Sequence, residues 1–577
     1  MAKPKTKTRN GGKPTRTERM IVADGLDHPI SLKLCKRLNR FFEALTFLTS
    51  LQKACGRGIQ EKAPSEASEA GEDHNRVLEC FINKLAQICD NKRRGPTVTS
   101  LAIVRPPDKL LYVFASNQRS TEDAEEAREF VLSILSYVNR ECAMPGFRGD
   151  ESSPVFRHLL RNILEFNHER IGYYRQSLLE RISQCLVDCT RFASEENDSL
   201  REALLAFQQT ALITPTGSDN ADDSGMIVSS SNEDLVRAVT ALRQSTTFNN
   251  IVDRCKAGKI DESRHWCELQ HFIGRLVSYF RAVQAILGAR RHHPELFDME
   301  DLEIRFINSS KPIPNPMNAF QAGLPPDQRT TARSAGVIIS RMTSDEVKQE
   351  AYRRYADELQ RCGLDNLIAR QCYTKSFRPI VHSEVLLLEW LQTDFAEETH
   401  SIPFYNDIKY IGCSKPTCRL CEYYFAAHNS GVRVRPSHRN VYPNWVVPNV
   451  LVEGETSQYK AKMIDSVLAK IRDDVFLALR EKVSERKRFD SETCSSLPTY
   501  QSVTGVSTDL GGLASLVEGL SLAGPVHASH LEVARDMSIG DDAWSVVARD
   551  DNDKGDDDDD DDDGGGTLVF TGRNTRI

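Results

Sequence analysis

The chain has 577 residues, 40% of them hydrophobic and 27% charged, an ordinary composition for a soluble protein of three or four domains. No stretch approaches the roughly 20 apolar residues of a bilayer span, and the basic N-terminus lacks the apolar segment of a secretory signal. The 15 cysteines are scattered, which favours a reducing compartment over a disulfide scaffold. These features predict an intracellular protein, cytoplasmic or nuclear, with no membrane partner.

The formal net charge of −8 conceals opposite charges at the two ends. Residues 1–20 carry a net charge of +6, whereas residues 541–577 carry −9 and include eight consecutive aspartates. The region between them is mildly acidic, so binding of a nucleic acid would require a local basic patch or the basic tail. We expect residues 1–24 and 495–577 to be disordered tails, because such polar sequences cannot offset the entropy of ordering.

Apolar residues recur at helical spacing through most of the first 340 residues. The expected helices are 32–51, 77–88, 127–138, 156–192 and 269–287. Stretches rich in Gly, Ser, Pro and charge predict loops at 56–75, 214–232 and 308–333. We therefore expect a helical N-terminal region over 25–96 and a helical insertion over 119–340, which could bind protein partners.

One stretch in this part departs from the helical pattern. Residues 98–116 contain two runs of β-forming residues around the sequence Pro-Pro-Asp-Lys at 106–109, which is typical of a turn. The pattern predicts a β-hairpin within residues 97–118.

From residue 343 onward, helices alternate with short strands. Thr343 and Glu346 fit a capping box for a helix that runs to about Cys362, with Gly363 as its stop. Further helices are expected over 385–391, 418–427 and 458–485, and strands over 407–412 and 432–434. This alternation favours parallel pairing in an α/β sheet within residues 341–494.

Two short motifs lie at helix starts in this region: H-S-E at 382–384 and C-R-L-C at 418–421. Two thiolates at a helix N-terminus can chelate one metal ion, and a histidine of a neighbouring helix can be a third ligand. His382, Cys418 and Cys421 would leave the fourth tetrahedral position of Zn²⁺ open for water, as catalytic zinc sites require.

Glu384 could reach such a water as a proton shuttle without being a ligand. Other interpretations of the same residues stay open. Cys413, Cys418 and Cys421 could form a different metal site, the cysteine pair could be ordinary core thiols, and Glu384 could be a helix N-terminal charge.

At these motifs the sequence resembles the zinc-dependent cytidine-deaminase-like superfamily, whose signature is H-x-E followed by P-C-x-x-C. Segments 381–391, 411–425 and 432–445 look like the fungal and bacterial branch predicted to deaminate nucleic acids or nucleotides. The resemblance implies a three-layer α/β/α core and Zn²⁺ held by the histidine and the two cysteines. It also implies that Glu384 is the general acid and base in attack of zinc-activated water on the amidine carbon of cytosine or adenine.

The resemblance further implies that the deaminase core begins with a hairpin, here residues 97–118, and resumes at 341–494. Several family members have a substrate-contacting Asn at the position of Asn117. Ser383 replaces a small apolar residue of the family motif, and His438 matches the pattern after the second strand. We take these three residues as candidates for substrate binding, although a loop histidine is often structural.

The sequence therefore predicts a zinc-dependent hydrolytic deaminase of a nucleobase, C or A, in a nucleotide or in single-stranded nucleic acid. The alternative is a catalytically inactive, zinc-stabilised interaction scaffold with a deaminase-like fold. Glu384 favours the enzyme, because a scaffold needs the three ligands but has no use for the acid.

Overall fold

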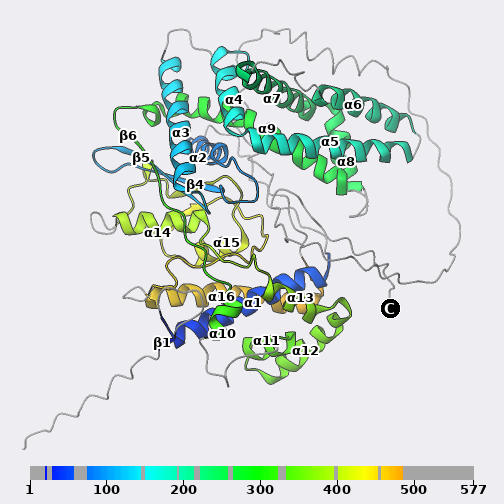
Figure 1. Ribbon diagram of the computed structural model, residues 1–577, viewed down its shortest axis with the longest axis vertical. Coiled ribbons are helices and arrows are strands. Elements are labelled where there is room, and N and C mark those ends of the chain that lie inside the picture. Colours follow the sequence, from blue (N-terminus) through cyan, green and yellow to red (C-terminus); the bar gives the residue numbers. More distant parts are fainter. Residues whose placement is uncertain are drawn as a thin grey trace, which may run out of the picture. The chain divides into compact units, whose positions relative to one another are not determined.

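The computed structural model in Figure 1 describes residues 20–21, 29–57, 74–143, 150–191, 194–212, 221–257, 264–322, 333–395, 401–452 and 457–484. The chain divides into two compact units. Unit 1 comprises residues 1–63, 310–393 and 417–488, and unit 2 comprises 64–309, 394–416 and 489–577. The tails expected at 1–24 and 495–577 lie outside the described residues, apart from strand β1 (Met20–Ile21).

Unit 2 contains a β-sheet built on the expected hairpin. Strands β4 (Thr99–Val104) and β5 (Leu110–Ser116) pair antiparallel, which confirms the hairpin predicted from residues 98–116. β7 (Tyr410–Cys413) pairs antiparallel with β4, and β6 (Leu302–Phe306) pairs parallel with β5. The strand order within the unit is therefore β6-β5-β4-β7.

β7 runs antiparallel to its neighbour β4, which lies outside the strands expected within residues 341–494. The hairpin, and not a crossover helix, supplies that neighbour. β6 was not expected at all. It pairs with β5 after all the helices of the 121–292 region, and only Ile304 of its five residues is buried.

Helix α2 (His74–Cys89) packs on β4 and β7. The packing is close at Gly412, where an added Cβ would lie 2.6 Å from both Ile82 Cγ2 and Asn83 Oδ1. The Asn83 amide donates to the Tyr410 hydroxyl at 2.9 Å. Every residue of β4 and β5 is buried, which explains their nearly continuous apolar sequences.

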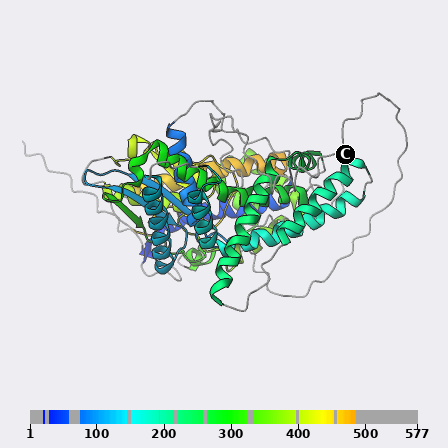
Figure 2. The same cartoon turned by 90° about the horizontal axis from the view of Figure 1, so that it is seen from above.

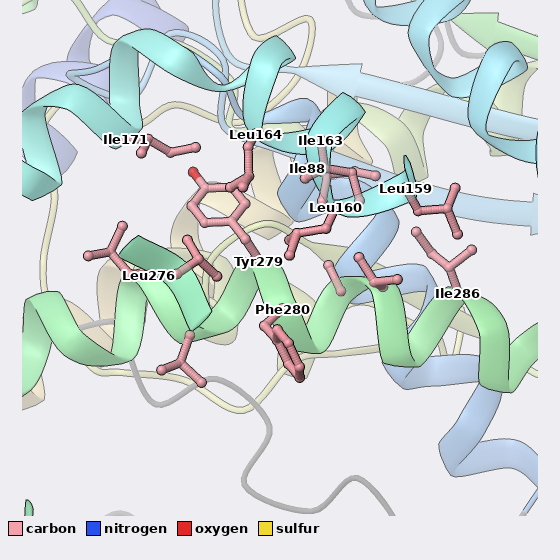
Figure 3. Packing of buried hydrophobic residues seen from close by; sticks show 14 of the residues in the cluster. Ile88, Leu159, Leu160, Ile163, Leu164, Ile171, Leu276, Tyr279, Phe280 and Ile286 are labelled. Atoms are coloured by element: carbon pink, nitrogen blue, oxygen red, sulfur yellow. The ribbon is translucent and has the colours of Figure 1, made fainter. Parts of the chain in front are cut away.

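The other helices of unit 2 form a bundle around α9. They are α3 (Thr121–Cys142), α4 (Pro154–Phe166), α5 (His168–Arg191), α6 (Glu195–Leu212), α7 (Ala221–Gln244), α8 (Thr246–Ala257) and α9 (Arg264–His292). Coloured cyan to green, α5 to α9 lie together in Figure 1, with α3 and α4 standing at one end of them, and Figure 2 shows the same helices from above. Tyr279 of α9 lies near Leu160 and Leu164 of α4, and Ile286 of α9 lies near Leu159 (Figure 3).

Two sequence expectations for this bundle are wrong. The helix expected over 156–192 is two helices, because Asn167 leaves helical geometry and its amide donates to the carbonyl oxygens of Ile163 and Ile88, both at 2.9 Å. The loop expected over 214–232 is helical from Ala221 onward, where α7 begins.

Unit 1 is organised around α1 (Leu32–Ala54), which Ser31 caps. α1 packs against α16 (Ser457–Glu481), α13 (Leu364–Tyr373), α11 (Ala335–Met342) and α10 (Pro316–Ala322). The last of these helices lies inside the stretch 308–333, which was expected to be a loop. Proline is favourable in the first turn of a helix, so a proline-rich sequence does not exclude one.

The helix predicted from Thr343 to about Cys362 is α12 (Glu346–Leu359), followed by a 3-10 turn and by Gly363 with a φ of +68°. Its N-cap is Asp345, which accepts from Lys348 N at 3.1 Å. The capping role expected of Thr343 is therefore wrong. Thr343 is the C-cap of α11 and is already committed to the preceding helix.

Unit 1 also contains α14 (Ser383–Phe395), α15 (Arg419–Ala427) and the short strand β8 (Arg433–Val434), where elements were expected. Its remaining strands are β2 (Ile30–Ser31), paired with β1, and β3 (Gly56–Arg57), paired with β9 (Val483–Ser484). The architecture is thus mixed α/β. The helices that the structure describes include none long and apolar enough to cross a membrane.

The two units do not follow the expected segment boundaries. The segment 25–96 contributes α1 to unit 1 and α2 to unit 2, and the segment 341–494 also contributes to both units.

Candidate metal centre

The backbone around Ile380 positions the first candidate ligand. Ile380 forms a parallel bridge with Trp445, and Val446 N donates to Ile380 O at 2.9 Å. Two residues later, His382 O accepts from Leu386 N at 2.9 Å, so His382 stands at the N-terminus of α14. Its side chain is therefore fixed at the point where the helix begins.

Cys418 and Cys421 occupy the first turn of α15. Cys418 is the N-cap residue, with φ −77° and ψ 163°, and its Sγ accepts from Cys421 N at 3.5 Å. Arg419 fixes this turn, because its backbone N donates to Asn440 O at 3.0 Å and its guanidinium pairs with Asp474 of α16 at 3.3 Å. Both thiols face inward and are buried.

The three side chains converge. His382 Nδ1 lies 3.5 Å from Cys418 Sγ and 3.6 Å from Cys421 Sγ. Tetrahedral zinc at about 2.0–2.1 Å from nitrogen and 2.3 Å from sulfur places such donor atoms about 3.6 Å apart. Among the residues that the structure describes, this is the one group of three His, Cys or acidic residues with ligand atoms within 4.8 Å of one another. The donor set and its spacing fit Zn²⁺.

The environment favours a thiolate at Cys418. Burial acts to raise the pKa of Cys418, but the hydrogen bond from the Cys421 thiol and the neighbouring His382 outweigh it, and the pKa is lowered well below its ordinary value. Burial and the adjacent Cys418 sulfur raise the pKa of Cys421. A divalent cation bound by both sulfurs would release the proton that the pair shares.

Glu384 lies in the first turn of α14, two residues after the histidine, and is only 4% exposed. Burial, followed by the charge of Cys418, raises the pKa of Glu384 to about 7, although His382, a backbone N–H and the Ser383 hydroxyl act in the opposite direction. Ser383 Oγ lies 3.5 Å from the Glu384 carboxylate. A carboxyl group with a pKa near neutrality can both accept and donate a proton.

His438 lies in the loop beside the metal centre. Its backbone N donates to Thr417 O at 3.1 Å, directly before the first cysteine ligand, and its Nδ1 accepts from Asn440 N at 2.9 Å. The ring of Tyr442 lies 5.6 Å from the His438 ring and 6.3 Å from the His382 ring. The loop therefore places His438 and an aromatic ring next to the ligand histidine.

Asn117 belongs to unit 2, where its amide donates to Gly95 O at 3.2 Å at the end of the hairpin. Cys413 also belongs to unit 2, as the last residue of β7, and is not a member of the group of candidate ligands. Substrate contact by Asn117, Ser383 and His438 stays a prediction.

Sequence reasoning gave no role at the site to Tyr442. Tyr442 and Trp445 follow β8 in an irregular loop, where no periodicity indicates the direction of a side chain. The one available signal was the presence of two aromatic residues in the otherwise polar sequence NVYPNW.

Residues 381–449 match the family model described as OTT_1508_deam-like deaminase. The matched segment contains all three candidate ligands and Glu384. The chain contains a deaminase-family domain. The match covers about an eighth of the 577 residues. Neither the curated proteins nor the solved structures include a match to this chain.

Proposed function

We propose that this protein is a zinc-dependent hydrolytic deaminase that acts on cytosine or adenine in a nucleotide or in single-stranded nucleic acid. The observation that carries the proposal is the convergence of His382, Cys418 and Cys421 beside the buried carboxyl group of Glu384. Three protein ligands keep one tetrahedral position of zinc open, as catalysis requires.

When bound, zinc supplies the Lewis acidity that activates water for attack on the amidine carbon of the base. Glu384 would accept one proton from the attacking water and deliver it to the ring nitrogen of the base. It would then take the second proton from the new hydroxyl group and give it to the amino group, which leaves as ammonia while the C–O bond becomes a carbonyl. The pKa of Glu384, about 7, suits these transfers. The Ser383 hydroxyl, 3.5 Å from the carboxylate, orients that carboxylate.

The charges next to the metal centre favour a substrate that carries phosphate. Segments 373–383 and 431–450 contain no acidic residue, although the whole chain is acidic. The bridge between Ile380 and Trp445 joins the two segments. We call these two segments the basic loops. Their positively charged residues are Lys375, Arg378, Arg433, Arg435 and Arg439. A local positive charge of this kind attracts nucleotides and nucleic acids to a protein of opposite net charge.

We also propose that residues 97–118 and 341–494 form one three-layer deaminase core, with 119–340 as a helical insertion that is available to protein partners. The pairing of β7 with the hairpin strand β4 supports this discontinuous core. An intracellular location, cytoplasmic or nuclear, is part of the same proposal and agrees with the thiol ligands, which need a reducing compartment.

The test is a product screen of the zinc-loaded full chain against cytidine, adenosine, their nucleotides, single-stranded DNA and RNA, read by mass spectrometry. We expect loss of an amino group from one base type in at least one of these substrates. A zinc-loaded, folded chain with no product on any of them would favour the inactive scaffold.

A further inference from the structure

Trp445 is the largest fully buried side chain in the part of the chain that the structure describes. Its backbone is tied to Ile380, two residues before the candidate ligand His382. Its ring packs against Phe41 of α1 at 5.9 Å and against Tyr424 of α15 at 6.3 Å. The indole is thus held between the segment that carries the histidine ligand and the helix that carries both cysteine ligands.

The indole N–H of Trp445 is buried and has no hydrogen-bond acceptor, sulfur included, among the described residues. This is unusual for a group that can only donate. Trp266, in contrast, donates to Asp188 Oδ2 at 3.0 Å. A buried donor without a partner points to an acceptor that forms only when the site is occupied.

The candidate acceptor is the Cys421 sulfur. Tyr424, against which the indole packs, is three residues after Cys421 and therefore on the same face of α15. A neutral thiol is a weak acceptor, whereas the thiolate formed on binding a metal is a strong one.

We propose that Trp445 is a positioning residue of the metal centre, whose indole N–H donates to the Cys421 thiolate when this thiolate ligates the metal. The inference rests on the proposed zinc site. Each thiolate would then have one N–H donor, because Cys418 Sγ already accepts from Cys421 N at 3.5 Å. Such donors orient a thiolate and withdraw electron density from it, which leaves the metal a stronger Lewis acid.

The experiment replaces zinc by Co²⁺ and records the thiolate-to-cobalt charge-transfer band, together with Zn²⁺ affinity from chelator competition. In Trp445→Phe, we expect the band to move to lower energy, because the thiolate becomes more electron-rich. We also expect roughly 10-fold weaker zinc binding, at the lower end of second-shell effects. Trp266→Phe, which removes an indole N–H bonded to a carboxylate, is the matched control and should change neither readout.

A second variant separates the hydrogen bond from packing. Benzothienylalanine at position 445 keeps the shape of the indole but has sulfur in place of the N–H, and it should reproduce the spectral shift of Trp445→Phe with wild-type thermal stability. An unchanged band in this variant would overturn the role of Trp445 while leaving the zinc site intact. A wild-type chain that binds no metal would overturn both proposals.

Discussion

The three candidate ligands reach one point because each stands where a helix begins. Helix starts leave backbone N–H groups without partners, and these groups favour thiolates and fix short side chains. His382 and the cysteine pair were predicted from this position and from their spacing. Their convergence within 4.8 Å agrees with that prediction.

The first prediction concerns the metal. In Cys418→Ser combined with Cys421→Ser, we expect loss of bound zinc and a lower melting temperature, because the free energy of binding at such a site also stabilises the fold. Elemental analysis and calorimetry measure the two effects. Cys372→Ala changes another buried cysteine of unit 1 and should retain one zinc per chain. Full zinc content in the double variant would refute the assignment of the ligands.

The second prediction separates the acid from the metal. Glu384→Gln should keep zinc and fold but lower turnover by about 10² to 10⁴-fold, the usual contribution of a positioned proton-transfer group. Glu389→Gln, on the same helix, is the control, because Glu389 bonds to Asn449 and lies outside the metal group. Equal turnover of the Glu384 variant and its parent would show that another group carries the proton.

At the scale of elements, the close contact between α2 and β7 depends on Gly412. An alanine there would place its Cβ 2.6 Å from Ile82 and Asn83. We expect Gly412→Ala to lower the free energy of unfolding by about 1–3 kcal/mol, as measured by urea denaturation. The control is Gly172→Ala in α5, where the added Cβ would meet no neighbouring atom within 4 Å. Because alanine has a higher helix propensity than glycine, this variant should raise the free energy of unfolding by up to about 1 kcal/mol.

The helical bundle contains a buried ion pair whose loss should be costly. Arg170 lies 2.7 Å from Asp90, with both side chains at most 3% exposed, and also donates to the Tyr174 hydroxyl at 2.6 Å. Arg170→Met leaves the Asp90 carboxylate buried without its cation, so we expect a loss of about 3–5 kcal/mol. Arg140→Met, which removes an exposed pair, should cost at most about 1 kcal/mol. Similar midpoints for the two variants in urea would contradict this difference.

Helices and strands could be predicted where a local sequence pattern specifies them. The prediction failed where contacts with residues far away in the sequence determine the structure. The apolar stripe at 156–192 continues across Asn167, so the sequence alone gave no sign of the break. Thr343 and Glu346 have the spacing of a capping box, but Thr343 was already the C-cap of α11. The short strand β6 was not predicted, because only Ile304 among its residues is buried and the sequence therefore shows no run of apolar residues there.

At the scale of the whole molecule, an acidic chain with basic loops beside its metal centre should bind polyanions in a salt-dependent way. Replacing Arg433 and Arg439 by alanine should weaken binding of a single-stranded oligonucleotide and reduce the salt slope by about 1.4. Fluorescence anisotropy at several salt concentrations measures both quantities. Arg140→Ala in unit 2 is the control. If the salt slope is the same in the Arg433/Arg439 double variant and in the Arg140→Ala control, the basic loops do not contact the oligonucleotide.

The order of synthesis gives the sheet of unit 2 a particular difficulty. β7 leaves the ribosome about 300 residues after β4, its partner. At about 5–20 residues per second, this is a wait of about 15 to 60 s. During that time the edge of β4 that will receive β7 has unpaired backbone groups and apolar side chains, a template for pairing with another chain. Expression at high ribosome density should therefore favour aggregation of nascent chains, and a chaperone that covers this edge should raise the yield.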